Sequence, residues 1–257
     1  MPFTLAHPAA VLPLRGLRHL HTAPLIIGAI APDIPYYAPG SFERFMPDTH
    51  EFVGSYTTCL ALGYLTLLAI LVLRRPLTAL LSPRARWLCL HALAPLRKRA
   101  SAWLLAGAAL VIGTWSHLLW DAATHSDGWI VHRVAALSAP VTIGSYTGPL
   151  CHVLQYVSSV FGLLVLVIWY WRLRAPAAVP PDPHAPRSAV RPILVLVASA
   201  GVLIGGVQAI AYLDHTHNIY RSINILLTHS LAWFAALYLV AGIVVTLEHH
   251  GEPRVRA

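Results

Sequence analysis

Apolar residues gather along the chain in five long runs, and the charged residues lie between these runs. A helix needs about 20 apolar residues to cross the hydrocarbon core of a bilayer. The pattern therefore predicts an all-α polytopic membrane protein, with one integral membrane domain over residues 1–257. The expected spanning helices are 53–73, 103–120, 148–171, 192–213 and 222–247.

A sixth apolar segment lies near the start of the chain, at 23–38 (APLIIGAIAPDIPYYA). It is too short and too rich in proline to cross a bilayer as a regular helix. Irregular backbone is tolerated at membrane depth only where protein buries it. We therefore expect a buried or re-entrant helix that packs on the bundle of spans.

Arginine is concentrated in alternate segments between the spans and in the tail. These segments are 74–102, 172–191 and 248–257. The positive-inside rule places all three in the cytoplasm. Residues 1–52, 121–147 and 214–221 are then extracytoplasmic. Within the first arginine-rich loop, 77–97 is expected along the membrane interface, with Arg84, Arg86 and Arg97 facing phosphate headgroups.

Composition supports the membrane assignment and argues against a nucleic-acid partner. Hydrophobic residues make up 57% of the chain and charged residues 11%, whereas soluble domains carry roughly 25% charged residues. The formal net charge of +8 would suit phosphate binding in a nucleic-acid protein. Here the arginines flank apolar spans, so membrane lipids are the expected partners.

The segment SHLLWDAATH, residues 116–125, carries the sharpest chemical pattern. His117, Asp121 and His125 are spaced i, i+4, i+8, which would place all three on one helical face. Imidazole and carboxylate groups are standard zinc ligands. A metal site is one interpretation. The alternative is a hydrogen-bonded Asp–His pair that caps the end of a membrane helix.

Other candidate ligands also fall on the predicted extracytoplasmic side. Asp33 lies between two prolines, His50 precedes the first span, and His7 lies in an apolar leader. Each has a simpler interpretation as a turn residue, a solvated loop histidine or a buried histidine bonded to a carbonyl. His152 lies near the outer start of the third span.

Two further groups are more ambiguous. Asp214, His215 and His217 could form a second cluster or an outer rim. His229 lies within the fifth span and needs a polar partner, for which Asn224 or a backbone group is a candidate.

Taken together, MPFTLAHPAAVLPLR, GAIAPDIPYY, DTHEFVGS and SHLLWDAATH resemble a bacterial membrane family of unknown function. They are similar to the YdjM-like inner-membrane proteins described as metal-dependent hydrolases. The ligand order also resembles that of zinc-dependent phospholipase C and the single-strand nucleases, which are all-helical. The resemblance maps ligand roles onto His7, Asp33, His50, His117 and Asp121, followed by His125 and His152.

The resemblance implies a metal-dependent hydrolase in the bacterial cytoplasmic membrane, with its active face outside. One or two divalent ions, zinc above all, are expected rather than three, because Tyr156 stands where the phospholipase pattern has Glu. The substrate would be a phosphoester in a lipid or lipid-linked molecule. Expected catalytic residues are the metal-bridging Asp33 and Asp121 and the proton acceptors Asp48 and Glu51, while Arg15, Arg18 and Arg133 are candidate phosphate-binding cations.

Two other functions remain open on the sequence alone. The same ligands would serve a non-hydrolytic enzyme, such as a cyclase or isomerase that acts on a lipid-like or diphosphate substrate. A metal-binding transport or accessory protein is the other alternative, but transport predicts ionisable residues deep in several spans.

Overall fold

The computed structural model describes residues 4–17, 20–37, 42–144, 146–176, 190–217 and 219–251. Most of these residues are helical. The α-helices are α1 (Pro8–Val11), α2 (Thr22–Ile30), α3 (Thr58–Val72), α4 (Arg74–Ala79), α5 (Pro83–Lys98), α6 (Ser101–Thr124), α7 (Trp129–Arg133), α8 (Ala135–Ser138), α9 (Leu150–Arg172), α10 (Val190–Thr216) and α11 (Ile219–Gly251). The 3₁₀-helices are η1 (Thr4–Ala6), η2 (Leu12–Gly16), η3 (Ala31–Tyr37), η4 (Phe42–Phe45), η5 (Pro47–His50) and η6 (Val53–Ser55).

Within the described residues, five helical segments are long and apolar enough to cross a membrane. They are Val53–Val72, Ser101–Thr124, Leu150–Arg172, Val190–Thr216 and Arg221–Glu248. The predicted all-α fold with five spans is therefore confirmed, and the chain is a multi-pass membrane protein. The second span is longer than the predicted 103–120, because α6 continues through Thr124. A short antiparallel hairpin that the sequence did not predict, β1 (Pro140–Ile143) and β2 (Tyr146–Pro149), precedes α9.

The chain divides into two compact units. The first comprises 1–35, 42–67 and 98–173, and the second comprises 36–41, 68–97 and 174–257. Because the chain passes between the units several times, they are not consecutive domains. The expected single membrane domain stays a prediction.

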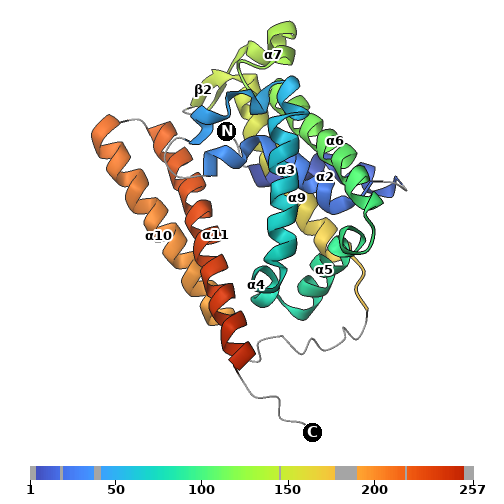
Figure 1. Cartoon of the computed structure of the whole chain (residues 1–257). Helices are drawn as coiled ribbons and strands as arrows, with labels where there is room; N and C mark the ends of the chain where they lie inside the picture. Colours follow the sequence, from blue (N-terminus) through green and yellow to red (C-terminus); the bar gives the residue numbers. More distant parts are fainter. Residues whose placement is uncertain are drawn as a thin grey trace. The chain divides into compact units, whose positions relative to one another are not determined.

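In the first unit, α2 lies across α6, and glycines on both helices allow a very close approach (Figure 1). A Cβ atom on Gly28 would lie 2.2 Å from the backbone oxygen of Leu110, and one on Gly113 would lie 2.3 Å from that of Leu25. The Thr114 hydroxyl of α6 donates a hydrogen bond to the Gly28 carbonyl of α2 at 3.2 Å, which also links the two helices. Small residues at such crossings are typical of membrane helices.

The predicted buried helix at 23–38 corresponds to α2 and η3. Leu25 and Ala29 are fully buried in a core that also includes Val11 and Ala109. Pro35 lies inside η3. Proline cannot donate a backbone hydrogen bond and clashes with the preceding turn, so the regular helix gives way to 3₁₀ turns here. The position of the turn places Asp33 directly after α2.

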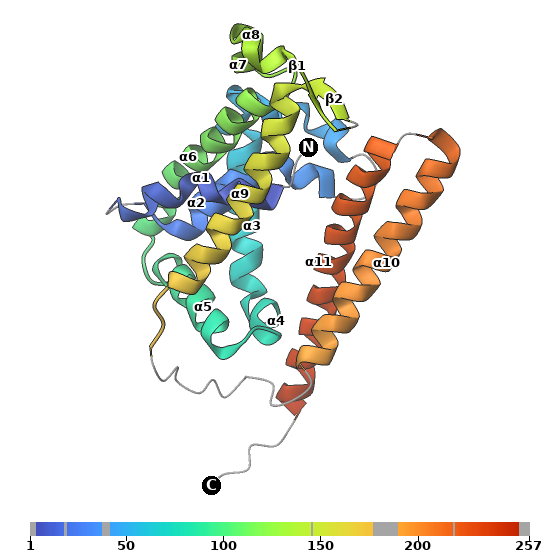
Figure 2. The same cartoon turned by 180° about the vertical axis from the view of Figure 1, so that it is seen from behind.

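The N-terminal elements η1 and α1 pack on α9, and α1 also contacts α2 and α6 (Figure 2). These contacts bring residues from the start of the chain to the end of α6. The fold of the first unit thus gathers side chains that are more than 100 positions apart in the sequence.

In the second unit, α10 and α11 form an antiparallel hairpin, and α4 packs on α11 (Figures 1 and 2). Arg86 of α5 is buried, and its guanidinium donates to the carbonyls of Thr78 at 2.9 Å and Ala79 at 2.7 Å. The expectation that Arg86 faces phosphate headgroups is therefore wrong. Its charge instead satisfies carbonyl groups at the end of α4, which lack helical partners.

Candidate metal centre

Helix α6 presents His117 and Asp121 on one face, as their spacing predicted. The Nδ1 atom of His117 lies 2.9 Å from the Ala29 carbonyl oxygen. A carbonyl only accepts hydrogen bonds, so Nδ1 carries the proton and donates. The Nε2 atom faces two carboxylates, 3.2 Å from Asp121 and 3.6 Å from Asp33.

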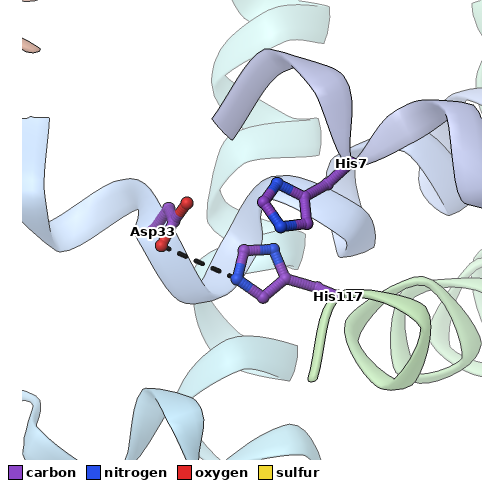
Figure 3. Close-up of side chains that lie close together, drawn as sticks. All are labelled: His7, Asp33 and His117. Atoms are coloured by element: carbon purple, nitrogen blue, oxygen red, sulfur yellow. Dashed lines mark ion pairs between the residues drawn. The ribbon is translucent and has the colours of Figure 1, made fainter. Parts of the chain in front are cut away.

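His7 repeats this arrangement from the N-terminal segment. Its Nδ1 lies 3.2 Å from the Thr4 carbonyl oxygen, and its Nε2 lies 3.0 Å from Asp121 Oδ1. The His7 ring stacks on the ring of His117 with 4.0 Å between centroids (Figure 3). Both histidines are therefore held by a backbone carbonyl on one side and point Nε2 into the cluster. Such a partner on the other nitrogen is usual for metal-ligating histidines.

Asp33 completes the buried part of the cluster and is 2% exposed. The Thr4 hydroxyl donates to its Oδ2 at 2.6 Å, while Oδ1 faces His50 Nε2 at 3.3 Å. Burial alone would raise the pKa of Asp33, but His117, His50, His7 and the Thr4 hydroxyl together hold that pKa below its ordinary value. The carboxylate is therefore ionised.

His50 forms the more open side of the cluster. Its Nδ1 lies 3.2 Å from the Thr49 hydroxyl, and its Nε2 also lies 3.8 Å from Asp121. The His50 side chain is 31% exposed, whereas those of His117 and Asp33 are at most 2% exposed. The cluster is thus closed on one side and accessible on the other.

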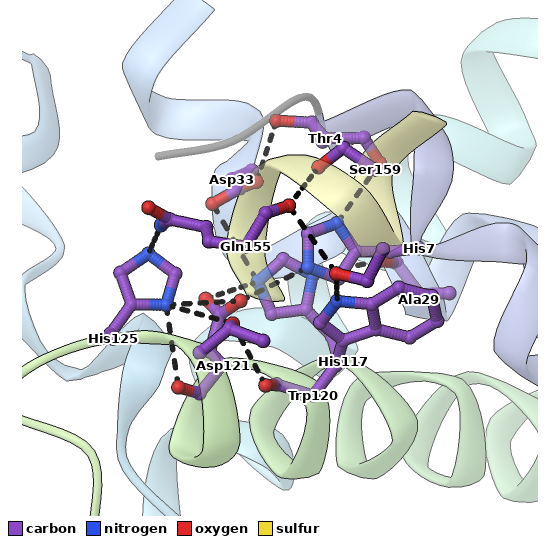
Figure 4. A network of polar contacts seen from close by, with 12 residues as sticks. Thr4, His7, Ala29, Asp33, His117, Trp120, Asp121, His125, Gln155 and Ser159 are labelled. Atoms are coloured by element: carbon purple, nitrogen blue, oxygen red, sulfur yellow. Dashed lines mark hydrogen bonds and ion pairs between the residues drawn. The ribbon is translucent and has the colours of Figure 1, made fainter. Parts of the chain in front are cut away.

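His125 lies differently from the sequence prediction. Helix α6 ends at Thr124, and His125 has an extended backbone (φ −106°, ψ 142°). Its Nδ1 lies 3.4 Å from the Asp121 carboxylate, and its Nε2 lies 2.8 Å from the side-chain nitrogen of Gln155 (Figure 4). Burial lowers the pKa of His125, although the Asp121 charge acts in the opposite direction. His125 thus lies just beyond the last residue of α6, although its ring contacts the Asp121 carboxylate as the i, i+4 spacing predicted.

The donor set fits a divalent metal ion. Two groups have ligand atoms within 4.8 Å of one another: His7, Asp33 and His117, and His50, His117 and Asp121. Asp33 Oδ1 and His117 Nε2 are buried and have no hydrogen-bond partner. An unpaired buried polar atom is costly, and a nitrogen lone pair that faces a carboxylate needs a cation or a proton between them. Mixed imidazole and carboxylate ligands suit zinc.

No hydrogen bond or ion pair given for the described residues joins the two predicted proton acceptors, Asp48 and Glu51, to this cluster. Asp48 accepts hydrogen bonds from the hydroxyls of Thr57 at 3.2 Å and Thr58 at 2.7 Å, at the start of α3. Glu51 is exposed. Asp48 thus has a local role at the start of α3, and the catalytic role of either residue stays a prediction.

Other predicted residues also lie apart from the cluster. Among the described residues, no hydrogen bond or ion pair joins His152 to the cluster. The contact from α9 is made instead by Gln155, whose side chain lies 2.8 Å from His125 Nε2. Arg133 donates to the Trp129 carbonyl, and Arg15 lies over the ring of Trp169. Arg18 lies outside the described residues.

The remaining histidine candidates lie in the second unit. Asp214, His215 and His217 are exposed, and no metal-binding group found among the described residues includes them. His229 has a polar partner as expected, but this partner is Gln208 of α10, at 2.8 Å, rather than Asn224 or a backbone group.

Sequence reasoning missed Thr4 and Gln155. A buried glutamine in the apolar run 148–171 was a usable signal, because a polar side chain within a span needs a partner. Thr4 offered no comparable signal, since a threonine near the start of a chain is unremarkable without the fold.

Comparisons with known proteins assign the chain to a family and to no described activity. No curated protein and no solved structure matches it. The resemblance to YdjM-like hydrolases and to zinc-dependent phospholipase C therefore stays a prediction. A family model described as a domain of unknown function, DUF4184, matches residues 1–247, and the chain belongs to this family.

Proposed function

We propose that the protein is a membrane-bound, metal-dependent hydrolase of a phosphoester in a lipid or lipid-linked substrate. One observation carries the proposal: the buried Nε2 of His117 and Oδ1 of Asp33 face each other across 3.6 Å without a hydrogen-bond partner. Since Nδ1 of His117 already donates to Ala29, a cation between these atoms would satisfy both.

The residues that would hold one or two divalent ions, with zinc as the expected metal, are His7, Asp33, His50, His117 and Asp121. A bound ion would polarise a phosphoryl oxygen and make a water molecule more acidic. Asp33 and Asp121 are the carboxylates close enough to accept the water proton, because Asp48 is engaged at the start of α3. The exposed side at His50 supplies the open position that a catalytic metal site needs.

The same arrangement supports a substrate that lies in the membrane. The cluster lies at the end of α6, an apolar helix long enough to cross a bilayer. A lipid-linked phosphoester could keep its apolar part beside the spans while its phosphate reaches the open side. The distribution of arginine supports a position of this side outside the cytoplasm, and the membrane in this proposal is the bacterial cytoplasmic membrane.

The proposal is tested by metal analysis of detergent-purified protein, followed by turnover assays with phospholipids, lipid diphosphates and soluble phosphodiesters. We expect close to one or two zinc ions per chain and zinc-dependent release of a phosphate-containing product. Well-folded, zinc-loaded protein that hydrolyses none of these substrates would contradict the hydrolase proposal. A zinc content near zero would contradict the metal centre itself.

The orientation has a separate test. Single cysteines in a background without Cys59, Cys89 and Cys151 can be labelled with an impermeant maleimide in intact cells. Positions within 126–147 are expected to react and positions within 84–99 are not. The reverse pattern would place the cluster on the cytoplasmic face.

A further inference from the structure

His125 lies between the cluster and helix α9 and contacts both. On one side its Nδ1 faces two oxygen atoms of Asp121, the carbonyl at 3.3 Å and the carboxylate Oδ1 at 3.4 Å. On the other side its Nε2 lies 2.8 Å from the amide of Gln155, which is 2% exposed. Figure 4 shows this chain of contacts beside the ring of His117.

The protons in this chain can be assigned from the acceptors. Both Asp121 oxygens accept hydrogen bonds, so Nδ1 of His125 must carry a proton and donate. The Nε2 atom of the neutral ring is then an acceptor, and the Gln155 amide nitrogen is the donor that matches it. The opposite amide orientation would leave the Gln155 oxygen facing a lone pair.

We propose that Gln155 and His125 form a positioning pair for Asp121, in which the Gln155 amide holds the His125 proton on Nδ1 and His125 does not ligate the metal. The pair rests on the proposed metal centre, because its purpose is to fix the Asp121 carboxylate against His7 and His117. The Nε2 atom of His7 lies 3.0 Å from Asp121 Oδ1, the same carboxylate oxygen that His125 contacts. This is the outer support that metal ligands commonly require.

Zinc affinity of two His125 variants tests the assignment. An asparagine side chain places an amide nitrogen where Nδ1 lies, so His125→Asn keeps a donor to Asp121, whereas His125→Leu removes it. We expect His125→Leu to weaken zinc binding about 10- to 100-fold and His125→Asn to stay close to the native affinity. The reference is His117→Ala, which removes a ligand. If His125→Asn lost zinc as completely as His117→Ala, His125 would be a ligand and the proposal would fail.

The position of the His125 proton gives a readout that needs no metal. Nitrogen-15 chemical shifts of metal-free protein labelled at histidine report which ring nitrogen is protonated. We expect Nδ1 in the native protein and in the control Ser158→Ala, whose hydroxyl contacts the Trp120 indole and the Gln155 backbone carbonyl but neither the Gln155 amide nor His125. Gln155→Glu replaces the donor with an acceptor, so both ring nitrogens then face acceptors and His125 should carry a proton on Nε2 as well as on Nδ1.

The two experiments separate the pair from the metal centre. A native His125 protonated on Nε2 would overturn the pair even if the protein binds zinc. A native protein that binds no zinc would overturn the proposed function, and the proton position would still decide whether Gln155 and His125 interact as described.

Discussion

Histidine occurs in two very different settings in this molecule. In the first unit, His7 and His117 each bond one nitrogen to a backbone carbonyl and direct the other at carboxylates. In the α10–α11 hairpin of the second unit, His229 bonds one nitrogen to the Gln208 side chain. Only the first setting brings several ring nitrogens and negative charges to one point.

The difference shows what a metal site requires beyond histidine itself. A histidine within a span needs a polar partner, and the neutral amide of Gln208 supplies one without any cation. Around Asp33 and Asp121, satisfying the histidines leaves two carboxylates and an unpaired Nε2 in a buried space. The convergence of ligand atoms, rather than the number of histidines, is therefore what supports the proposed metal centre.

The largest expected effect comes from breaking this convergence. His117→Ala should abolish zinc binding and destabilise the protein by about 3–5 kcal/mol, as removal of one partner from a buried ion pair does. Zinc content and thermal unfolding in detergent measure both quantities. His229→Ala is the matched control from the hairpin and should keep full zinc content. Equal zinc loss in both variants would contradict the assignment of the metal site to the cluster around His117.

The second prediction concerns the helix crossing that supports the cluster. Gly28→Ala places a Cβ against the Leu110 backbone and should cost about 1–3 kcal/mol of stability, as overpacking does. It should also weaken zinc binding, because Ala29 and Asp33 move with α2. Gly206→Ala on α10 is the control: its nearest contact would be Leu226 at 3.9 Å. If Gly28→Ala changed neither the stability nor the zinc affinity, the contact between α2 and α6 would have room for a Cβ atom and the prediction would be wrong.

The sequence was sufficient to predict the spans, because charge and apolar length are local properties. It also indicated Asp33, His50, His117 and Asp121, whose residue types and neighbours suggested ligands. It could not show where α6 ends, at Thr124, and therefore how the His125 ring lies between Asp121 and Gln155. Nor could it show that Asp48 accepts hydrogen bonds at the start of α3, because the fold determines which acceptor the Thr57 and Thr58 hydroxyls meet.

A smaller effect is expected from the acidic residue beside His50. Asp48→Ala removes the acceptor of two threonine hydroxyls and should lower stability by about 1 kcal/mol, with zinc content unchanged. Glu51→Gln, at an exposed position, should change neither quantity. Thermal unfolding and zinc analysis report the outcome. A fall in turnover of about 100-fold with zinc retained would instead identify Asp48 as the proton acceptor.

The smallest predicted effect lies in the hairpin. Gln208→Leu leaves His229 without its side-chain partner and should cost about 0.6 kcal/mol, the average for hydrogen bonds between membrane helices. Zinc content should not change. A large loss of zinc in this variant would mean that the Gln208–His229 pair belongs to the metal centre, and the comparison above would have to be abandoned.

The long separation between His7 and Asp121 has a consequence for biosynthesis. The two residues are 114 positions apart, so α6 must leave the ribosome before His7 or Asp33 can meet His117 and Asp121. Until then the growing chain carries Asp33, which is buried in the folded protein, without the His117 ring that faces it in the complete fold. Synthesis of the first span therefore precedes assembly of the cluster, and a nascent chain that ends before α6 lacks His117 and Asp121 of the proposed ligand set.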